Sequence, residues 1–487
     1  MENKNLNVKI INATKWSSIT EIIAKLITPI TNMILARILA PEAFGVVATI
    51  TMIMSFADML TDSGFQKYLV QHEFRNESEK IKYTNVAFWT NLFISIFLWI
   101  IIIATSDVLA SLVGNDGLGN VISIACIQLP ITSFSSIQMA IYRRDFDFKT
   151  LFNVRIISIF TPFFITIPLA MLGLNYWSLI IGNIFGNFIN AVMLTVRSKW
   201  KPSYYYNFDI LKEMISFSIW TLIESISIWL TTWIDTFIIG SFLSSYYLGV
   251  YKNSLSMVNS IFTVVIATTT PILFSALSRV QNDDKEFKKI FFSMQKTAAY
   301  IILPMAIGMY VYRDFMVKIL FGDRWIEGNQ VVGLWALTSG IVILFGNYFS
   351  EVYRAKGKPK LSFIVQVLHL IVLIPVCSIS GKFGFEIFVK WRVLIRLQLV
   401  LVHILVMNCI IKIPVIKIFK NIFIPAISSI FMGIVGVYLN KLNNNIMWNL
   451  LSIIICVNIY FGVLMLFKKS RQEVFNILHT MKIKKFL

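Results

Sequence analysis

About fourteen apolar runs follow one another along this chain, and they limit its fold more than any other feature. Each is long enough, at roughly 20 residues, to cross the hydrocarbon core of a bilayer as an α-helix. The composition agrees, because 57% of the residues are hydrophobic and 14% are charged, whereas soluble proteins average about 25% charged residues. The sequence therefore predicts an all-α polytopic membrane protein. We expect spans at about residues 11–35, 43–65, 83–105, 121–142, 151–172, 176–196, 214–239, from the turn at 241–251 to 277, 291–311, 330–348, 361–379, 385–411, 418–439 and 446–467.

The formal net charge is +19, and its distribution predicts the orientation of the chain. Lys and Arg gather in alternate loops, such as the segments 67–82, 143–149 and 353–360. Cytoplasmic loops of membrane proteins carry such an excess of basic residues. We therefore expect both termini on the cytoplasmic side. We interpret the basic residues as signals of topology and expect no nucleic-acid binding.

Motifs for catalysis or for metal and cofactor binding are missing from the sequence. The four histidines are scattered and do not form an HExxH motif. The cysteines Cys126, Cys377, Cys409 and Cys456 lie in apolar runs without a zinc-ligand spacing, so we expect free, buried thiols. We therefore expect a protein that is not an enzyme and that needs no cofactor.

A weak internal repeat predicts two lobes. At one common offset, Trp16-Ser17 aligns with Trp220-Thr221, and Phe44-Gly45-Val46 aligns with Leu248-Gly249-Val250. Transporters are often built from two such halves, with the substrate site between them. We therefore interpret the first twelve helices as two six-helix lobes and the last two helices as an addition. The predicted parts are residues 1–203, 204–417 and 418–487.

Ionisable residues within the predicted spans are the candidates for a functional site. A charge at the centre of a bilayer costs about 2.5–3.5 kcal/mol on insertion scales, so such a residue usually faces a wet cavity or a partner. The cationic candidates are Lys25, Arg155, Lys252 and Arg396, and the acidic candidates are Glu21, Asp58, Glu224 and Asp235.

Simpler roles stay open for several of these residues. Glu21 and Lys25 are four residues apart on one helix face and can neutralise each other. Arg155 lies about one turn from the cytoplasm and can merely anchor its helix, and Lys252 can extend to the membrane surface. Asn187 belongs to a group of asparagines that predicts polar crosslinks between closely packed helices.

Six motifs carry a family likeness over about residues 10–360. They are LARILAPEAFGVVA, FADMLTDSGFQKYLVQ, YRRDFDFK, WIDTFIIGSFLSSYYLGVYKNSLSMVNS, PILFSALSRVQNDDKEFKK and ILFGDRWIEG. Together they resemble the polysaccharide transporter family, the Wzx-like exporters of lipopolysaccharide and exopolysaccharide, within the MOP superfamily. The resemblance implies a MOP/MATE-like fold.

The resemblance also implies a function. A member of this family would be a flippase that moves undecaprenyl-diphosphate-linked oligosaccharide across the bacterial inner membrane for O-antigen, capsule or exopolysaccharide assembly. The mechanism would be alternating access. The four cations would pair with phosphate oxygens of the substrate, and the four acids would bind Na+ or a proton and couple transport to an ion gradient. Membrane lipids and the polysaccharide polymerase are the further partners that this role implies.

Three other functions stay open from the sequence. A related MATE-type drug/cation antiporter would have a mainly acidic and aromatic cavity with few cations. A membrane enzyme of polysaccharide assembly would carry a large outer loop, whereas every predicted outer loop here is short. A scaffold for the assembly machinery would leave no mark in the sequence.

Overall fold

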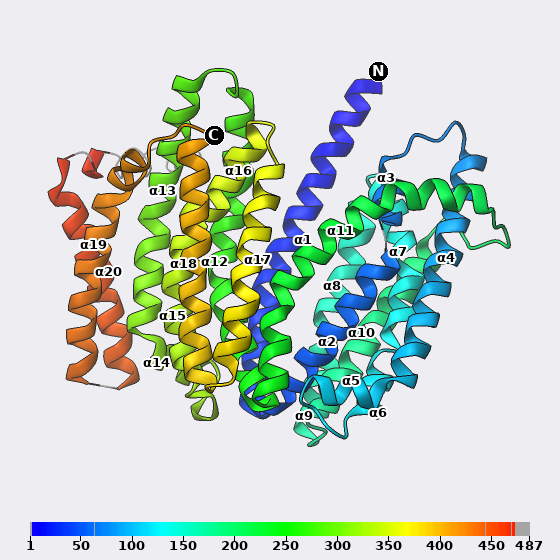
Figure 1. Ribbon diagram of the computed structural model, residues 1–487, viewed down its shortest axis with the longest axis horizontal. Coiled ribbons are helices and arrows are strands. Elements are labelled where there is room, and N and C mark those ends of the chain that lie inside the picture. Colours follow the sequence, from blue (N-terminus) through cyan, green and yellow to red (C-terminus); the bar gives the residue numbers. More distant parts are fainter. Residues whose placement is uncertain (1, 63, 444, 469, 473–487) are drawn as a thin grey trace. The chain divides into compact units, whose positions relative to one another are not determined.

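The computed structural model of this protein describes residues 2–62, 64–443, 445–468 and 470–472. The chain divides into two compact units, Met1–Asn253 (unit 1) and Ser254–Leu487 (unit 2). Within the described residues every regular element is a helix (Figure 1). The predicted lobe boundaries at 203/204 and 417/418 stay predictions.

Eleven helices of the described structure lie wholly within unit 1. They are α1 (Glu2–Ile38), α2 (Pro41–Asp62), α3 (Phe65–Gln71), α4 (Glu77–Ala104), α5 (Ser106–Leu112), α6 (Gly119–Ala125), α7 (Gln128–Arg144), α8 (Phe148–Phe164), α9 (Thr166–Met171), α10 (Tyr176–Arg197) and α11 (Phe208–Phe242). In Figure 1, α11 bends, so that its first turns lie across the end of unit 1 near α3 and its remainder runs along α2.

A long helix, α12, begins in unit 1 and continues into unit 2. The elements from there on are α12 (Ser245–Arg279), α13 (Asp284–Val311), α14 (Arg313–Leu320), the 3₁₀ turn η1 (Asp323–Trp325), α15 (Gly328–Val342), the π-helical turn η2 (Ile343–Asn347), α16 (Tyr348–Ala355), α17 (Lys360–Gly381), α18 (Phe385–Cys409), α19 (Val415–Leu442) and α20 (Ile446–Leu466).

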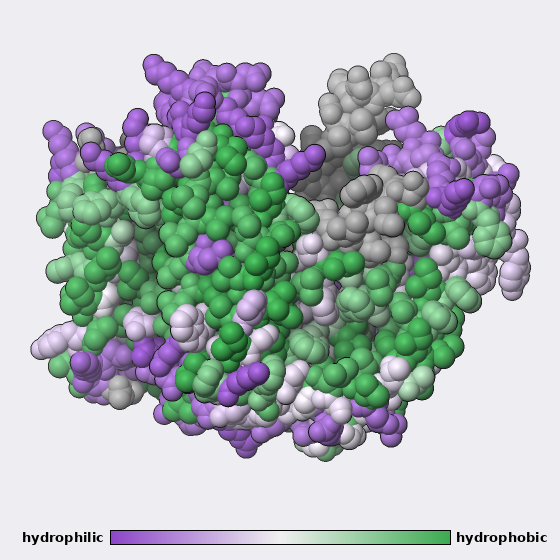
Figure 2. Space-filling model, in the orientation of Figure 1, coloured by the Kyte–Doolittle hydropathy of each residue, from purple (hydrophilic) through white to green (hydrophobic). Residues whose placement is uncertain are grey.

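The surface of each unit is that of a membrane protein. Thirteen helical segments of the described part are long and apolar enough to cross a bilayer. On the face that Figure 2 shows, a belt of hydrophobic side chains lies between hydrophilic ends in each unit. Large apolar side chains such as Phe93 and Ile434 are 71% and 64% exposed, as expected where lipid is the solvent. The predicted all-α polytopic fold is therefore confirmed. α1 covers the first predicted span, but many of its side chains lie outside the described residues.

Two predicted spans are each divided into two helices. The span at 121–142 consists of α6 and α7, and the span at 151–172 consists of α8 and α9, which meet at Ile165. Pro168 explains the second break, because it has no N–H with which to continue the α-helical ladder. It lies in the first turn of α9, where a missing donor costs little.

A π-helical turn interrupts the helix that the sequence predicts at 330–348. The N–H of Tyr348 bonds to the carbonyl oxygen of Ile343, five residues back. The carbonyl oxygen of Leu344, the next residue, accepts a hydrogen bond from Nε2 of Gln295 on α13, at 3.3 Å. The amide of Asn421 on α19 donates to Oε1 of Gln295, at 3.4 Å. A fully buried glutamine thus donates to a carbonyl group within the π turn.

The starts of α2 and α12 cross at two glycines. A β-carbon at Gly45 would overlap the carbonyl oxygen of Ser245, and a β-carbon at Gly249 would overlap that of Pro41. Gly45 and Gly249 are equivalent in the sequence repeat, and so are Pro41 and Ser245. Each glycine therefore contacts the first residue of the other helix. The contact is thus symmetric, like an interface between two identical subunits related by a two-fold axis. Small residues allow such close approach of membrane helices.

The cysteines agree with the prediction in three cases. Cys126, Cys377 and Cys456 are free and buried. Cys409 is free but exposed, so the prediction of a buried thiol was wrong there. The reason is its position as the last residue of α18, where the helix ends at the surface of unit 2.

Candidate functional site

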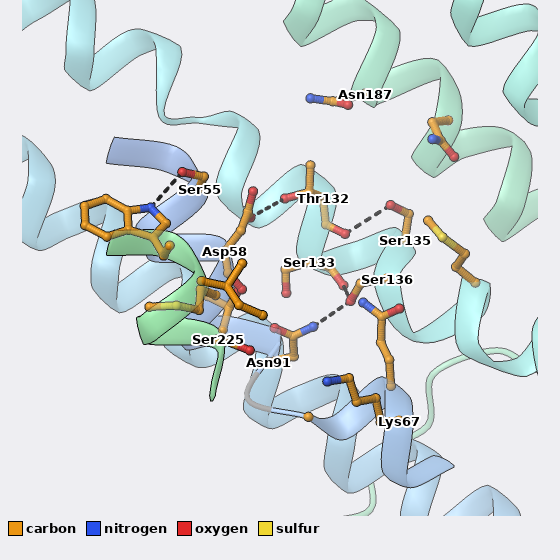
Figure 3. A pocket seen from close by; sticks show the side chains of 18 of the residues that line it. Ser55, Asp58, Lys67, Asn91, Thr132, Ser133, Ser135, Ser136, Asn187 and Ser225 are labelled. Atoms are coloured by element: carbon orange, nitrogen blue, oxygen red, sulfur yellow. Dashed lines mark hydrogen bonds between the residues drawn. The ribbon is translucent and has the colours of Figure 1, made fainter. Parts of the chain in front are cut away.

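A polar cavity of about 580 Å³ lies within unit 1. Its walls come from α2, α3, α4, α7, α10 and α11. In Figure 3, side chains from several of these helices point toward one common space. Its volume is in the range of small-molecule sites. Its polar lining residues include Ser55, Asp58, Asn91, Thr132, Ser133 and Ser136.

Asp58 is the one carboxylate among the described lining residues. The hydroxyl group of Thr132 on α7 lies 3.2 Å from Oδ1 of Asp58 on α2, close enough to donate a hydrogen bond to it. Thr61, one turn further along α2, donates to the Asp58 backbone carbonyl at 2.9 Å. A half-buried carboxylate in a bilayer-length helix therefore has hydrogen-bonding neighbours and an adjoining polar space, as the cost of burying its charge requires.

Neutral hydrogen bonds hold the other walls together. Nδ2 of Asn91 donates to the Ser136 hydroxyl at 2.6 Å and joins α4 to α7. The indole N–H of Trp229 donates to the Ser55 hydroxyl at 2.9 Å and joins α11 to α2. Asn187 on α10 donates to the side chain of Gln128 on α7 at 2.7 Å, which confirms the predicted polar crosslink for this asparagine.

Three polar atoms of lining residues have no hydrogen-bond partner within the described part of the chain. They are Oδ1 of Asn91, Oγ of Ser133 and Oδ1 of Asn190. Asn91 and Ser133 are 1% and 3% exposed. A buried polar group without a partner costs about 1–3 kcal/mol by protein mutational data. These atoms therefore keep unused hydrogen-bonding capacity at the wall of the cavity.

Of the predicted residues, Asp58 lines this cavity and two others lie near its wall. The ammonium group of Lys252 lies 4.2 Å from the ring centre of Trp233, and that ring lines the cavity. Asp235 is 2% exposed and accepts hydrogen bonds from the Tyr251 hydroxyl and the Thr236 N–H, both at 2.8 Å. Asp235 is thus held in a packed hydrogen-bonded environment between α11 and α12.

None of the other predicted residues is among the described residues that line this cavity. Lys25 is half-buried on α1, and Arg155 is exposed on α8. Arg396 belongs to unit 2, where it lies over the Trp335 ring at 3.7 Å and donates to the hydroxyls of Thr338 and Ser339. The side chains of Glu21 and Glu224 lie outside the described residues.

Sequence reasoning missed most of the cavity. Lys67, the one cation among the described lining residues, lies on the short helix α3 within a segment expected to be a loop. The hydroxyls of Thr132, Ser133, Ser135 and Ser136 come from a single stretch of α7. That concentration of hydroxyl side chains in an otherwise apolar span was the signal available in the sequence.

Helix α3 is fixed at the edge of the cavity from two sides. Gly64 precedes it with φ of 85°, a left-handed conformation that glycine adopts without strain. One nitrogen of Arg144 on α7 donates to the carbonyl oxygens of Leu69 and His72 at 2.7 and 2.6 Å. The Arg144 guanidinium also lies 4.5 Å from the ring centre of Phe74. The last carbonyl groups of α3 are thereby satisfied by a cation, as helix C-termini prefer.

Glu213 of α11 holds the other side of α3. Its two carboxylate oxygens accept hydrogen bonds from the hydroxyls of Tyr68 on α3 and Tyr83 on α4, at 2.6 and 2.7 Å. The hydrogen bond from Tyr68, followed by that from Tyr83, holds the pKa of Glu213 below its usual range. Burial raises the pKa of Tyr68, and the bond to Glu213 adds to that effect. The carboxylate therefore stays charged and keeps both donors at neutral pH.

We expect Glu213→Gln to lower the unfolding temperature of the detergent-solubilised protein at pH 7. A carboxyl group with a lowered pKa stabilises the folded state above its unfolded pKa of about 4.3, and this contribution disappears as the pH falls through the folded pKa. The difference between wild type and variant should therefore shrink on acidification below about pH 4. Thermal unfolding at both pH values is the measurement.

Glu77→Gln is the matched control for this substitution. Glu77 is an exposed residue whose pair with Lys80, at 3.3 Å and i,i+3, should contribute little. Equal unfolding temperatures of wild type and Glu213→Gln at pH 7 would contradict the assigned role. So would a difference between them that is unchanged in acid.

Comparison with known proteins supplies the family. The family model described as "Polysaccharide biosynthesis protein" matches residues 34–330. The lipopolysaccharide biosynthesis protein WzxC of Escherichia coli (strain K12) is 22% identical over 384 residues, 78% of this chain and 76% of that protein. The succinoglycan biosynthesis transport protein ExoT of Rhizobium meliloti (strain 1021) is 24% identical over 315 residues, 64% of this chain and 63% of that protein.

Solved structures supply the fold. The lipid II flippase MurJ, in an inward closed conformation, matches with a TM-score of 0.77 at 15% identity, over 93% of this chain and 98% of that one. An inward-facing MATE multidrug resistance transporter of the MOP superfamily matches with a TM-score of 0.62 at 13% identity, over 84% of this chain and 99% of that one. The molecule is thus a multi-pass membrane protein with the fold of MOP transporters. Within that class, the chain belongs to the polysaccharide biosynthesis protein family.

Proposed function

We propose that this protein is a flippase for undecaprenyl-diphosphate-linked oligosaccharide. It moves this substrate from the cytoplasmic to the outer leaflet of the bacterial inner membrane, for O-antigen, capsule or exopolysaccharide assembly. The observation that carries the proposal is a match to a polysaccharide biosynthesis family over residues 34–330 in a chain with a MOP transporter fold. Relatives named for lipopolysaccharide biosynthesis and for succinoglycan transport support it.

The mechanism we propose is alternating access coupled to an ion gradient, with no enzymatic step and with both termini in the cytoplasm. Lys25, Arg155, Lys252 and Arg396 are the proposed cationic contacts of the substrate. Glu21, Asp58, Glu224 and Asp235 are the proposed sites of Na+ or proton binding. Of these, Asp58 has the strongest structural support, because it adjoins a polar cavity. The polysaccharide polymerase stays the proposed partner protein.

A drug/cation antiporter is the second candidate function. The fold is shared with a MATE transporter, and the unit 1 cavity contains Asp58, Trp229 and Trp233. Such an acidic and aromatic site would suit an organic cation. Against it, most of the polar lining residues are neutral hydroxyls and amides, which suit sugars better than cations.

The test is the fate of lipid-linked oligosaccharide in cells that lack this protein and any substitute flippase. We expect it to accumulate on the cytoplasmic leaflet, with loss of surface polymer, and we expect the wild-type gene to restore both. Normal surface polymer together with increased sensitivity to cationic drugs would favour the antiporter. Repeat units that reach the outer leaflet but stay unpolymerised would favour a role in assembly.

A further inference from the structure

We infer that the unit 1 cavity is a glycan subsite, which takes uncharged sugar units of the substrate and leaves its diphosphate outside. This inference rests on the proposed function, which names a lipid-linked oligosaccharide but not the part of it that any pocket binds. The observations that carry it are a polar lining made mostly of hydroxyl and amide groups, its unused hydrogen-bonding atoms and an aromatic wall.

The polar lining matches the hydrogen-bonding needs of sugars. Sugar hydroxyls both donate and accept, and so do serine, threonine and the side-chain amide. Ser133, Asn91 and Asn190 offer oxygen atoms that no described residue occupies, and Ser133 and Asn91 are more than nine-tenths buried. In Figure 3, Asn91 and Ser133 lie beside the same space as Thr132 and Ser136. A molecule with several hydroxyls can satisfy these atoms together.

Two tryptophans on one face of α11 supply the aromatic wall. Trp229 and Trp233 are four residues apart and both line the cavity. The Trp229 ring is held by its hydrogen bond to Ser55 and by edge contact with Phe56, whose ring centre is 4.9 Å away. Lys252 lies against the Trp233 ring. Both rings line the cavity beside polar groups, so they can contact the C–H surface of a sugar while the polar groups orient it.

The charges of the lining argue against a diphosphate inside the cavity. A carboxylate such as that of Asp58 accepts hydrogen bonds but donates none, so it offers nothing to the oxygen atoms of a phosphate. Lys67, the one described cation of the lining, is exposed on α3 at the edge of the cavity. A diphosphate needs several cations or backbone donors to replace its water. The cavity therefore suits a neutral glycan segment.

Ser133→Ala is the decisive variant, because the Ser133 hydroxyl has no partner to lose in the described structure. Removing an unsatisfied buried hydroxyl should leave the unfolding temperature unchanged or raise it. If the hydroxyl binds sugar, its removal should weaken affinity roughly three- to tenfold, the range of one hydrogen bond. Trp229→Phe, which keeps an apolar ring, should also weaken binding. Ser95→Ala is the matched control, since Ser95 is a buried serine of α4 that does not line the cavity.

The measurement is isothermal titration calorimetry of the purified full-length protein. The probes are the lipid-linked oligosaccharide extracted from the deletion strain, the free oligosaccharide released from it by mild acid, and inorganic pyrophosphate. We expect the free oligosaccharide to bind saturably, both cavity variants to bind it more weakly, and pyrophosphate not to compete. Binding of the intact lipid alone, competition by pyrophosphate, or unchanged affinity of both variants would overturn the glycan subsite. Failure of the wild-type gene to restore surface polymer would instead overturn the flippase function.

Discussion

Gly45→Ala is expected to prevent stable packing of α2 against α12. The added β-carbon would overlap the backbone carbonyl oxygen of Ser245, which cannot rotate away as a flexible side chain can. Overpacking a close-packed contact typically costs about 1–3 kcal/mol, and a rigid backbone neighbour places this substitution at the upper end or beyond. Gly249→Ala should have a similar effect, because its β-carbon would overlap the carbonyl oxygen of Pro41.

The measurement is the yield of monodisperse protein in detergent together with its thermal unfolding midpoint. Gly308→Ala is the matched control, since it lies within helix α13 and a β-carbon there meets no atom within 4 Å. Alanine is also the better helix former, so this control should be neutral or slightly stabilising. If Gly45→Ala unfolded at the wild-type temperature, the close crossing of the two helix starts would be refuted.

Arg144→Ala should destabilise unit 1 by about 1.5–3 kcal/mol, the usual value of hydrogen bonds to a charged group. The substitution leaves the carbonyl oxygens of Leu69 and His72 without their charged donor. It also removes the contact of the guanidinium with the Phe74 ring. Because α3 carries Lys67 to the edge of the cavity, we expect export of polymer to fall together with stability.

The neighbouring arginine provides an internal control. Arg143 is exposed, and within the described part of the chain its guanidinium donates to the side chains of Gln66 and Met139, at 3.3 and 3.2 Å. Arg143→Ala should therefore change stability by less than about 0.5 kcal/mol. Arg144→Lys should restore part of the loss, since an ammonium group can reach a carbonyl oxygen but lacks the planar fork of arginine. Thermal unfolding and surface-polymer assays of the three variants are the measurements. Equal effects of Arg143→Ala and Arg144→Ala would contradict the role of Arg144 as a clamp.

Hydropathy was sufficient to place most membrane helices. The span predicted at 176–196 is α10, Tyr176–Arg197, and the span predicted at 446–467 is α20, Ile446–Leu466. Both succeed because a bilayer sets the length of the apolar run and polar residues mark its ends. The divisions of α6 from α7 and of α8 from α9 were not predicted. The prolines in the second of these spans were visible in the sequence, but proline alone does not tell a kink from a break.

The cavity was harder to predict because its lining is mostly neutral. Charged residues in a membrane helix are the usual candidates for a functional site, because burying a charge costs free energy. Yet Arg155 is exposed, and Arg396 has hydrogen-bond partners within unit 2. A hydroxyl can instead bond to its own helix: the Ser135 hydroxyl donates to the carbonyl of Thr132, and the Thr132 hydroxyl is within reach of the carbonyl of Leu129 as well as of Asp58. Such a residue is equally compatible with lipid, packing or water in a sequence, so only the tertiary arrangement identifies the polar face.

The π turn at Ile343–Asn347 affects how this chain should be aligned with others. A π turn holds one residue more than the α-helical turn it replaces. The flanking segments α15 and α16 therefore meet in a register that an uninterrupted α-helix of the same length would not give. A homologue without the turn will need a one-residue gap within 343–347, and a gapless alignment would rotate every position of one flank by about 100° around the helix axis. Gln295 marks the place of that gap, because its side chain donates to the carbonyl group of Leu344 within the π turn.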